Sequence, residues 1–468
     1  MPEHILFLTG RLAEKSLHRV LEDMRPSDFS YDVHEVGINV AGLMTADMIR
    51  RRMPEPPKAD RVVVPGRCRG DLDLLMAHYG IPVQRGPDEL KDLPQFFGKG
   101  GKAADLSRHD VKIFAEIVDA PRMTIEAVLE RAYRFRHDGA DVIDIGCLPE
   151  TSFELLEEMI RSLKGAGFAV SVDSVDPNEL LRGGRAGADY LLSLKEEMLW
   201  LADEVASTPV LIPSVPGDVK SLCRAIELLT DRGRQFYADP ILDPIHFGFS
   251  DSIVRYVELR RAYPQVPIMM GIGNVTELTD ADTSGINAVL MGLISELHVS
   301  AVLTTEVSPH ARRAVREVDV ARRMMYAARE DNSLPRGYTS DLLTVHGRKP
   351  FPDTPEEIAE IAKAIKDPSF RVQVSSDGIH VYNRDGHHLV TNPFDIWPAL
   401  GLQEDGGHAF YLGVETARAQ IAWQLGKRYA QDQEIDWGCA LDRDADDKRE
   451  QCAPGTTLEA RPFRHKKP

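Results

Sequence analysis

Residues 139–146 read Gly-Ala-Asp-Val-Ile-Asp-Ile-Gly, and this stretch decides the fold of the chain. Its centre, Val142–Ile145, is a short, largely β-branched run bounded by glycines, which is typical of a buried strand. Helix-like segments stand on both sides of it, Thr124–His137 before and Ser152–Leu163 after. A strand between two such segments predicts a parallel sheet whose faces are covered by helices.

The same unit recurs before and after this stretch. Most of the apolar runs begin 20–33 residues after the previous one, and each is followed by a helix-like segment. The eight runs are Ile113–Val118, Val142–Ile145, Ala169–Val172, Tyr190–Leu192, Val210–Ile212, Gln235–Ala238, Pro267–Met270 and Ala301–Thr304. Eight consecutive units without a reversal favour a (β/α)₈ TIM barrel over residues 106–330, whereas an open doubly wound sheet is the alternative.

Two further regions flank this predicted barrel. Residues 1–105 alternate short strands with helices, which predicts an N-terminal α/β domain of Rossmann or flavodoxin type. Residues 331–468 contain two Asp-Gly pairs between alternating runs, which predicts hairpins in a small C-terminal α+β domain. From Cys439 onward charges dominate, and we expect a poorly ordered charged tail.

Composition excludes several classes of function. The chain has 468 residues, 56 of them basic and 73 acidic, for a net charge of −17, which argues against nucleic-acid binding. No uncharged apolar stretch is long enough for a membrane span. The five cysteines are scattered without metal-ligand spacing, which favours a reducing compartment. We therefore expect a cytoplasmic protein with neither nucleic-acid nor membrane partners.

The strand ends supply the candidate site residues, because barrels carry their sites at the C-terminal ends of the strands. Asp119, Asp144, Asp173 and Asp239 each follow or close a predicted strand. One such Asp alone is equally consistent with a helix cap or a turn. Four that converge on one face suit a ligand with adjacent N–H donors, such as an aminopyrimidinone ring, since a carboxylate accepts two parallel hydrogen bonds.

Other strand ends carry smaller or basic side chains that we predict to bind substrate. His310 and Arg312 suit an anion near the last strand, although a solvated helical turn is the alternative reading. Gly271 and Gly273 allow a ligand to approach the backbone closely. The remaining candidates at these ends are Ser193, Lys195 and Asn274.

The order and spacing of several short motifs resemble the pterin-binding family, which contains dihydropteroate synthase and the pterin domains of corrinoid-dependent methyltransferases. The motifs are residues 139–146, Val170–Ser174, Gly187–Asp189, Asp239-Pro240 and Met270–Val275. The whole chain resembles the long dihydropteroate-synthase-like proteins of methanogens and methylotrophs that make tetrahydromethanopterin. This resemblance implies a pterin-binding TIM barrel, a pterin substrate and a homodimer.

The resemblance also implies roles for single residues. Asp173 and Asp239 match the aspartates that contact the pterin, and Asp144 matches the motif aspartate that ends the second strand. These three are the implied catalytic residues. Asp119 replaces an Asn that helps to hold Mg²⁺ and diphosphate in the synthase, so Asp119 is the implied ligand of Mg²⁺. Asn274 replaces a Lys of the synthase.

Two functions follow from this resemblance. The first is condensation of a 6-hydroxymethyl-dihydropterin diphosphate with a ribofuranosyl-aminobenzene phosphate, an arylamine, with release of diphosphate. The second is binding of a reduced pterin without condensation, as a carrier or as a methyltransferase pterin domain. Thr305 and Glu306 stand where the synthase has Arg-x-His, which favours the second function. No recognisable corrinoid-binding His motif is present, which counts against methyl transfer.

Overall fold

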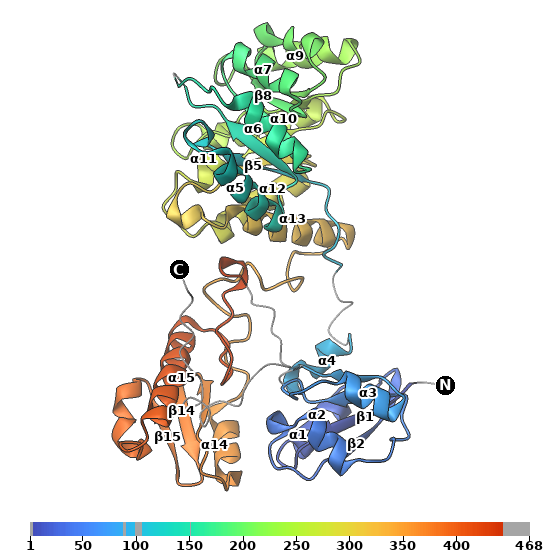
Figure 1. Ribbon diagram of the computed structural model, residues 1–468, viewed down its shortest axis with the longest axis vertical. Helices are drawn as coiled ribbons and strands as arrows, with labels where there is room; N and C mark the ends of the chain where they lie inside the picture. Colours follow the sequence, from blue (N-terminus) through green and yellow to red (C-terminus); the bar gives the residue numbers. More distant parts are fainter. Residues whose placement is uncertain (1–2, 88–89, 99–104, 150, 443–468) are drawn as a thin grey trace. The chain divides into compact units, whose positions relative to one another are not determined.

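A computed structural model of the chain describes residues 3–87, 90–98, 105–149 and 151–442 (Figure 1). The chain divides into two compact units. One unit holds residues 104–344 and 437–441, and the other holds residues 1–103, 345–436 and 442–468. The charged tail lies outside the described residues from residue 443 onward. The division into three domains proposed from the sequence stays a prediction.

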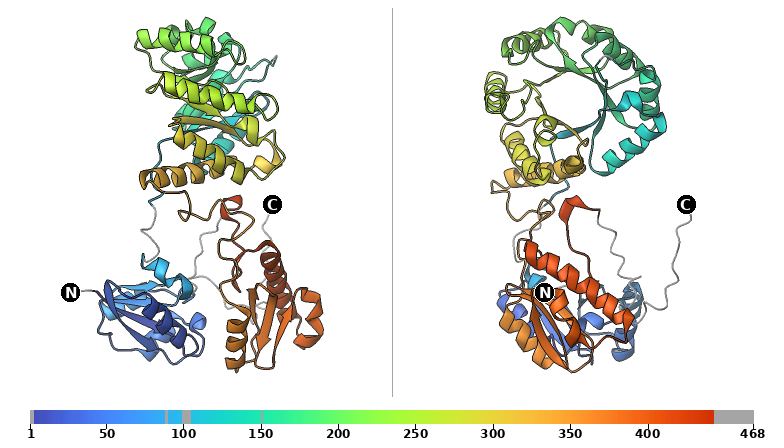
Figure 2. Two further views of the ribbon diagram at one scale, coloured as in Figure 1. Left: turned by 180° about the vertical axis from the view of Figure 1, so that it is seen from behind. Right: turned by 90° about the vertical axis from the view of Figure 1, so that its left-hand side faces the viewer.

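The first unit is a closed barrel of eight parallel strands. β5 pairs with both β6 and β12, and an isolated parallel bridge between Ala238 and Ile268 joins the ends of the sheet. The strands form a ring with helices outside it (Figure 2, right). The predicted (β/α)₈ barrel is confirmed. Its strands are β5 (Lys112–Ile117), β6 (Val142–Gly146), β7 (Ala169–Asp173), β8 (Tyr190–Leu194), β9 (Thr208–Leu211), β10 (Tyr237–Ala238), β11 (Met269–Gly271) and β12 (Ala301–Thr305).

Helices follow each strand and cover the barrel. Thr124 and Asp218 cap α5 and α9 through their side chains, and the start at Thr124 is the one predicted from the sequence. The start predicted at Ser152 is wrong, because α6 begins at Leu156 and Phe153 packs into the core before it. The helices are α5 (Ile125–His137), α6 (Leu156–Gly165), α7 (Pro177–Ala186), α8 (Leu201–Glu204), α9 (Val219–Asp231), α10 (Phe249–Ala262), α11 (Gly273–Thr276), α12 (Thr283–Glu296) and α13 (Ala314–Glu330).

The alternation of side chains along each strand creates two separate cores. Residues of one parity pack against the helices in the large outer cluster. Residues of the other parity fill the barrel interior, where the ring of Tyr190 lies 4.9 Å from that of Phe114 and 6.1 Å from that of Tyr237. The inner cluster also contains Val142, Leu192, Val210, Met269 and Ala301. The lower interior is therefore packed with side chains, which leaves the C-terminal mouth as the place for a ligand.

The second unit contains two sheets. One is parallel, in the order β2-β1-β3-β4, and the other is antiparallel, in the order β13-β14-β15. The parallel sheet comprises β1 (Glu3–Thr9), β2 (Phe29–Glu35), β3 (Arg61–Val64) and β4 (Val83–Arg85), with α1 (Glu14–Asp23), α2 (Ala46–Arg52), α3 (Asp73–Tyr79) and α4 (Leu93–Phe96). The antiparallel sheet comprises β13 (Arg371–Ser375), β14 (Gly378–Asn383) and β15 (Gly386–Val390), with α14 (Pro355–Ala364) and α15 (Gly406–Leu425).

The turns of the antiparallel sheet lie where the two Asp-Gly pairs occur in the sequence. Gly378 has a φ of 143°, and a Cβ there would lie 2.7 Å from the carbonyl oxygen of Val390. Only glycine fits this position, for both reasons. The side chain of Asp405 caps the start of α15, and Gly426, with a φ of 60°, ends this helix.

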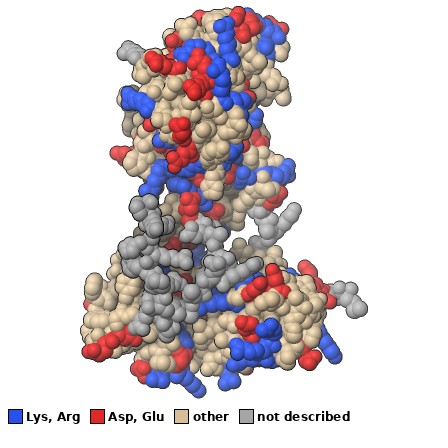
Figure 3. Space-filling model, viewed as in Figure 1, with Lys and Arg blue, Asp and Glu red and all other residues tan. Residues whose placement is uncertain are grey.

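The helices and the surface charge of the described residues relate to the expectations about membrane and nucleic-acid partners. No helix within the described ranges is both long enough and apolar enough to cross a bilayer. On the face drawn in Figure 3, basic and acidic side chains lie interspersed over the barrel unit.

Candidate functional site

Three carboxylates meet at the C-terminal mouth of the barrel because of strand parity. Glu116 lies two residues after the interior Phe114 on β5, and Asp144 lies two residues after the interior Val142 on β6. The register places Glu116 opposite Asp144, and Gly146 of β6 opposite Asp173 of β7. Glu116, Asp144 and Asp173 can each offer one carboxylate oxygen, and these atoms all lie within 4.8 Å of one another. We call these three residues the carboxylate cluster.

Two serines orient the cluster from neighbouring strands. The Ser171 hydroxyl donates to Oδ1 of Asp144 at 2.5 Å, and the Ser193 hydroxyl donates to Oδ1 of Asp173 at 2.6 Å. Oδ2 of Asp144 is buried and has no hydrogen-bond partner. Ser193 reaches Asp173 because its φ is 67° and the β8–β9 register shifts between Leu191 and Leu194. Such left-handed residues concentrate at functional sites, where surrounding structure holds the strain.

Asp239 adds a fourth carboxylate after β10, and it is buried. Its Oδ1 accepts hydrogen bonds from the Tyr256 hydroxyl at 2.5 Å and from the Ile241 amide at 2.7 Å. Ile241 has a φ of 67°, which is rare for a β-branched residue and bends the chain around the carboxylate. The backbone amide of Gly271 also hydrogen-bonds to the Asp239 carboxylate and lowers its pKa.

The pKa values of all four acids are raised. Burial raises the pKa of Glu116 to about 7 and that of Asp239 to about 6. Burial also raises the pKa of Asp144 well above its ordinary value and raises that of Asp173. Every charged neighbour that acts on these pKa values is itself an acid. The mouth therefore favours bound protons, a cation or a ligand rich in N–H donors.

The raised pKa of Glu116 predicts an unusual pH dependence of stability. A carboxyl whose folded pKa lies near 7 rather than 4.5 contributes full stability below pH 4.5, and this stability is lost as the pH rises to about 7. We expect Glu116→Gln to remove this loss. Unfolding by urea, with chelator present, measures the free energy of unfolding of both proteins. The value for Glu116→Gln minus that for the unsubstituted protein should increase by about 2 kcal/mol between pH 5 and pH 8.

The matched control is Glu130→Gln on the exposed side of α5. We expect its effect on the free energy of unfolding to be the same at both pH values. If the difference in free energy of unfolding between Glu116→Gln and the unsubstituted protein is also the same at both pH values, the raised pKa of Glu116 is contradicted.

The structure does not bring every predicted residue to this cluster. Asp119 follows β5 at the start of the 3₁₀ turn Ala120–Arg122, where its half-exposed carboxylate pairs with Arg131 at 2.7 Å. Asn274 is exposed, and its amide donates to the Leu242 carbonyl. His310 donates from Nε2 to the Thr276 carbonyl.

The other predicted substrate-binding residues also lie in loops after the strands. Lys195 is partly buried at the start of the 3₁₀ turn Glu196–Met198, directly after β8. Arg312 is exposed after the turn Pro309–Ala311. Gly273 opens α11, and a Cβ there would lie 3.3 Å from a methyl group of Thr305.

Sequence reasoning missed Glu116, Ser171 and Tyr256. The signal for Glu116 was present, because counting in steps of two from the apolar Phe114 leads to Glu116 and passes over Asp119. The same count on β7 leads from Ala169 through Ser171 to Asp173. Nothing in the sequence indicates that Tyr256, on α10, reaches the carboxylate of Asp239.

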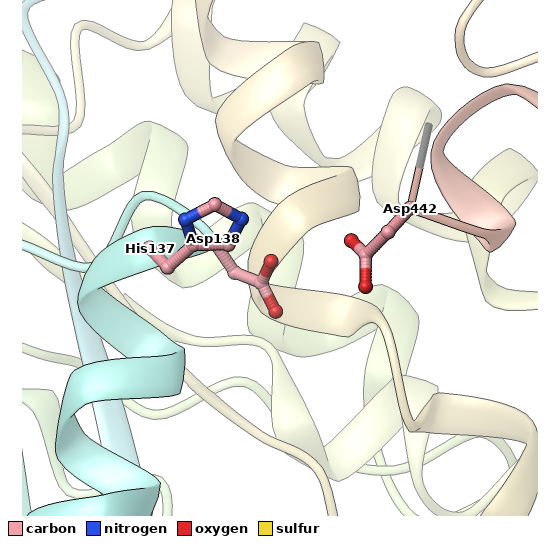
Figure 4. Close-up of side chains that lie close together, drawn as sticks. All are labelled: His137, Asp138 and Asp442. Carbon is pink, nitrogen blue, oxygen red and sulfur yellow. The ribbon is translucent and has the colours of Figure 1, made fainter. Parts of the chain in front are cut away.

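A second acidic group lies away from the mouth. Figure 4 shows His137 and Asp138 at the C-terminal end of α5, together with Asp442. Asp138 is buried, and its Oδ1 lies 3.5 Å from Nη2 of Arg313. Asp442 belongs to the other unit, so we assign no site to this group.

Fold and site together define a (β/α)₈-barrel protein with buried carboxylates at its C-terminal mouth. Residues 3–88 match a sequence family described as "Family of unknown function (DUF6513)". Across 523 aligned positions the chain is 27% identical to "Uncharacterized protein MJ0107" of Methanocaldococcus jannaschii, covering 92% of this chain and 98% of that protein. Neither match assigns an activity.

The solved structures that are similar to the chain include dihydropteroate synthases. The enzyme of Yersinia pestis with a pterin–sulfa conjugate is 18% identical, with a TM-score of 0.38, over 48% of this chain and 95% of that chain. The enzyme of Anaplasma phagocytophilum with 6-hydroxymethylpterin-monophosphate is 17% identical, with a TM-score of 0.36, over 46% and 98%. With identities of 18% and 17% and TM-scores of 0.38 and 0.36, the ligands of these two enzymes are not transferred to this chain.

Proposed function

We propose that the barrel binds a pterin and condenses it with an arylamine. The substrates would be a 6-hydroxymethyl-dihydropterin diphosphate and a ribofuranosyl-aminobenzene phosphate of tetrahydromethanopterin assembly. The observation that carries the proposal is the set of four carboxylates at the mouth, two buried and two partly buried, whose charged neighbours are themselves acids. Such a set lacks hydrogen-bond donors, and an aminopyrimidinone edge offers several side by side.

Asp173 and Asp239 would hold the pterin ring between them. Oδ1 of Asp173 is engaged by Ser193, and Oδ1 of Asp239 is engaged by Tyr256 and Ile241. Each carboxylate is thereby oriented before a ligand arrives, with the Gly271 amide also beside Asp239, and the second oxygen of each would accept from a ring N–H. Preorganised acceptors of this kind lower the cost of fixing a ligand in one pose.

The reaction exchanges one bond at the pterin methylene carbon. The arylamine nitrogen forms a bond to this carbon with its lone pair, and the carbon–oxygen bond to diphosphate breaks with its electron pair on oxygen. The nitrogen then loses a proton to solvent. Positive charge that develops on the ring and methylene would be stabilised by the acids at the mouth.

The polar residues around the mouth would bind the two phosphate-bearing parts. Lys195 and Arg312 are the cations of this set, and Gly271 and Gly273 would let a ligand approach the backbone closely. His310 and Asn274 complete the proposed substrate-binding set. Asp119 does not fit the role of Mg²⁺ ligand, because Arg131 engages its carboxylate, and no step here involves a metal at Asp119.

Titration calorimetry with 6-hydroxymethyl-dihydropterin diphosphate, followed by addition of the arylamine phosphate and assay of diphosphate, tests this function. We expect saturable binding and then release of diphosphate that requires both substrates. Binding without release would replace condensation by the carrier or methyl-transfer function. Absence of binding would overturn the pterin assignment itself.

A further inference from the structure

The carboxylate cluster of Glu116, Asp144 and Asp173 contains more carboxylates than are needed to hydrogen-bond one edge of a pterin ring. One oxygen from each of the three lies within 4.8 Å of the other two, and each acid belongs to a different strand. Carboxylates at this separation repel one another strongly wherever water is excluded. Bound protons or a bound cation at this place would relieve the repulsion.

An unpartnered buried oxygen marks where such a cation would sit. Asp144 is fully buried, Ser171 occupies its Oδ1, and its Oδ2 has no hydrogen-bond partner. Buried carboxylate oxygens are normally satisfied, so an orphan among other acids indicates a missing ligand. Ser171 and Ser193 hold two of the three carboxylates in place, as outer hydrogen bonds do around metal ligands.

The backbone leaves room for the third acid at the same place. A Cβ at Gly146, which ends β6, would lie 2.8 Å from Oε1 of Glu116. Any larger residue at position 146 would therefore displace this oxygen. The glycine keeps the Glu116 carboxylate beside Asp144, its register partner.

We propose that Glu116, Asp144 and Asp173 bind one hard divalent cation of the Mg²⁺ and Mn²⁺ class. All three donors are carboxylates, and the cluster contains neither His nor Cys, which is the ligand set that these ions prefer over zinc or copper. Asp239 is not among the ligands and remains for the organic substrate, whereas Asp173 would contact both the cation and the pterin. Cation binding does not depend on the proposed condensation.

Titration of Mn²⁺ into the full-length protein, freed of metal by chelator, tests this site. The electron paramagnetic resonance signal of free Mn²⁺ reports uptake without any assay of activity. We expect one site per chain, with Mg²⁺ as competitor. Glu116→Gln and Asp144→Asn should each weaken Mn²⁺ binding at least tenfold. Gly146→Ala, which keeps all three carboxylates, should weaken it as well.

Asp119→Asn is the matched control, because it removes a nearby acid that pairs with Arg131 instead. Its Mn²⁺ affinity should equal that of the unsubstituted protein. Absence of uptake, or uptake that neither Glu116→Gln nor Asp144→Asn weakens, would overturn the site.

Thermal unfolding provides a second readout that a purely structural role would not reproduce. With chelator, Glu116→Gln should melt above the unsubstituted protein, because one repelling charge is gone. With Mn²⁺, only the unsubstituted protein should gain in Tm. Equal gains in both proteins would contradict the proposal. Pterin titration of the chelated protein is a separate measurement, so failure of the cation site and failure of the proposed function are distinguishable.

Discussion

Replacing Asp239 by Asn is expected to weaken pterin binding by about two orders of magnitude. Oδ1 of Asp239 accepts from Tyr256 and from the Ile241 amide. In the variant, the amide oxygen would take this position, and the NH₂ group would then face the N–H donors of the ligand. Such a donor–donor contact in a buried site costs about 2–5 kcal/mol, and each 1.4 kcal/mol is tenfold in affinity.

Two controls sharpen this measurement by titration calorimetry. Tyr256→Phe removes one bond to Asp239 but leaves the Ile241 amide in place, so its loss of affinity should be smaller than that of Asp239→Asn. Asp231→Asn changes an exposed acid at the end of α9 and should leave affinity unchanged. Unchanged pterin affinity in Asp239→Asn would exclude Asp239 from the binding site.

Replacing Arg322 by Ala is expected to cost the barrel about 3–5 kcal/mol of unfolding free energy. Arg322 is 2% exposed and donates to the Val111 carbonyl at 2.6 Å and to the Gly139 carbonyl at 2.9 Å. It also pairs with Asp141 and Asp319. The side chain thus links the last helix of the barrel to its first strand, and its loss would leave two acids and two carbonyls without this donor.

Unfolding by urea, followed by fluorescence, measures this cost. The control is Arg323→Ala, because Arg323 shares the Asp319 partner but is more exposed. Its cost should be about 1 kcal/mol, as for a partly exposed ion pair. A cost below that of Arg323→Ala would show that Arg322 does not hold the barrel closed. Pterin affinity of the folded fraction should be unchanged, since Arg322 lies away from the mouth.

The local sequence pattern was sufficient to predict the barrel and to place some of the acids at its C-terminal mouth. Eight runs of apolar residues at regular spacing specify eight strands, since each run can be buried only between helices and a packed interior. Asp144, Asp173 and Asp239 could be placed at the mouth because a strand end is visible in the sequence and the C-terminal ends of barrel strands lie together. Helix starts such as Thr124 were equally visible, because capping is a contact between near neighbours.

The acids that meet depend on which residues of each strand face the barrel axis. Counting in steps of two along β5 separates Glu116 from Asp119, but only the fold shows that Phe114, and with it Glu116, faces inward. The left-handed conformation of Ser193 and the contact of Tyr256 with Asp239 depend on how a strand end meets the neighbouring strand or helix, which local pattern does not show. The sequence by itself determined the elements and their order, which follow from short-range periodicity. The barrel's closure decided the site, because closure brings the ends of separate strands within hydrogen-bonding distance.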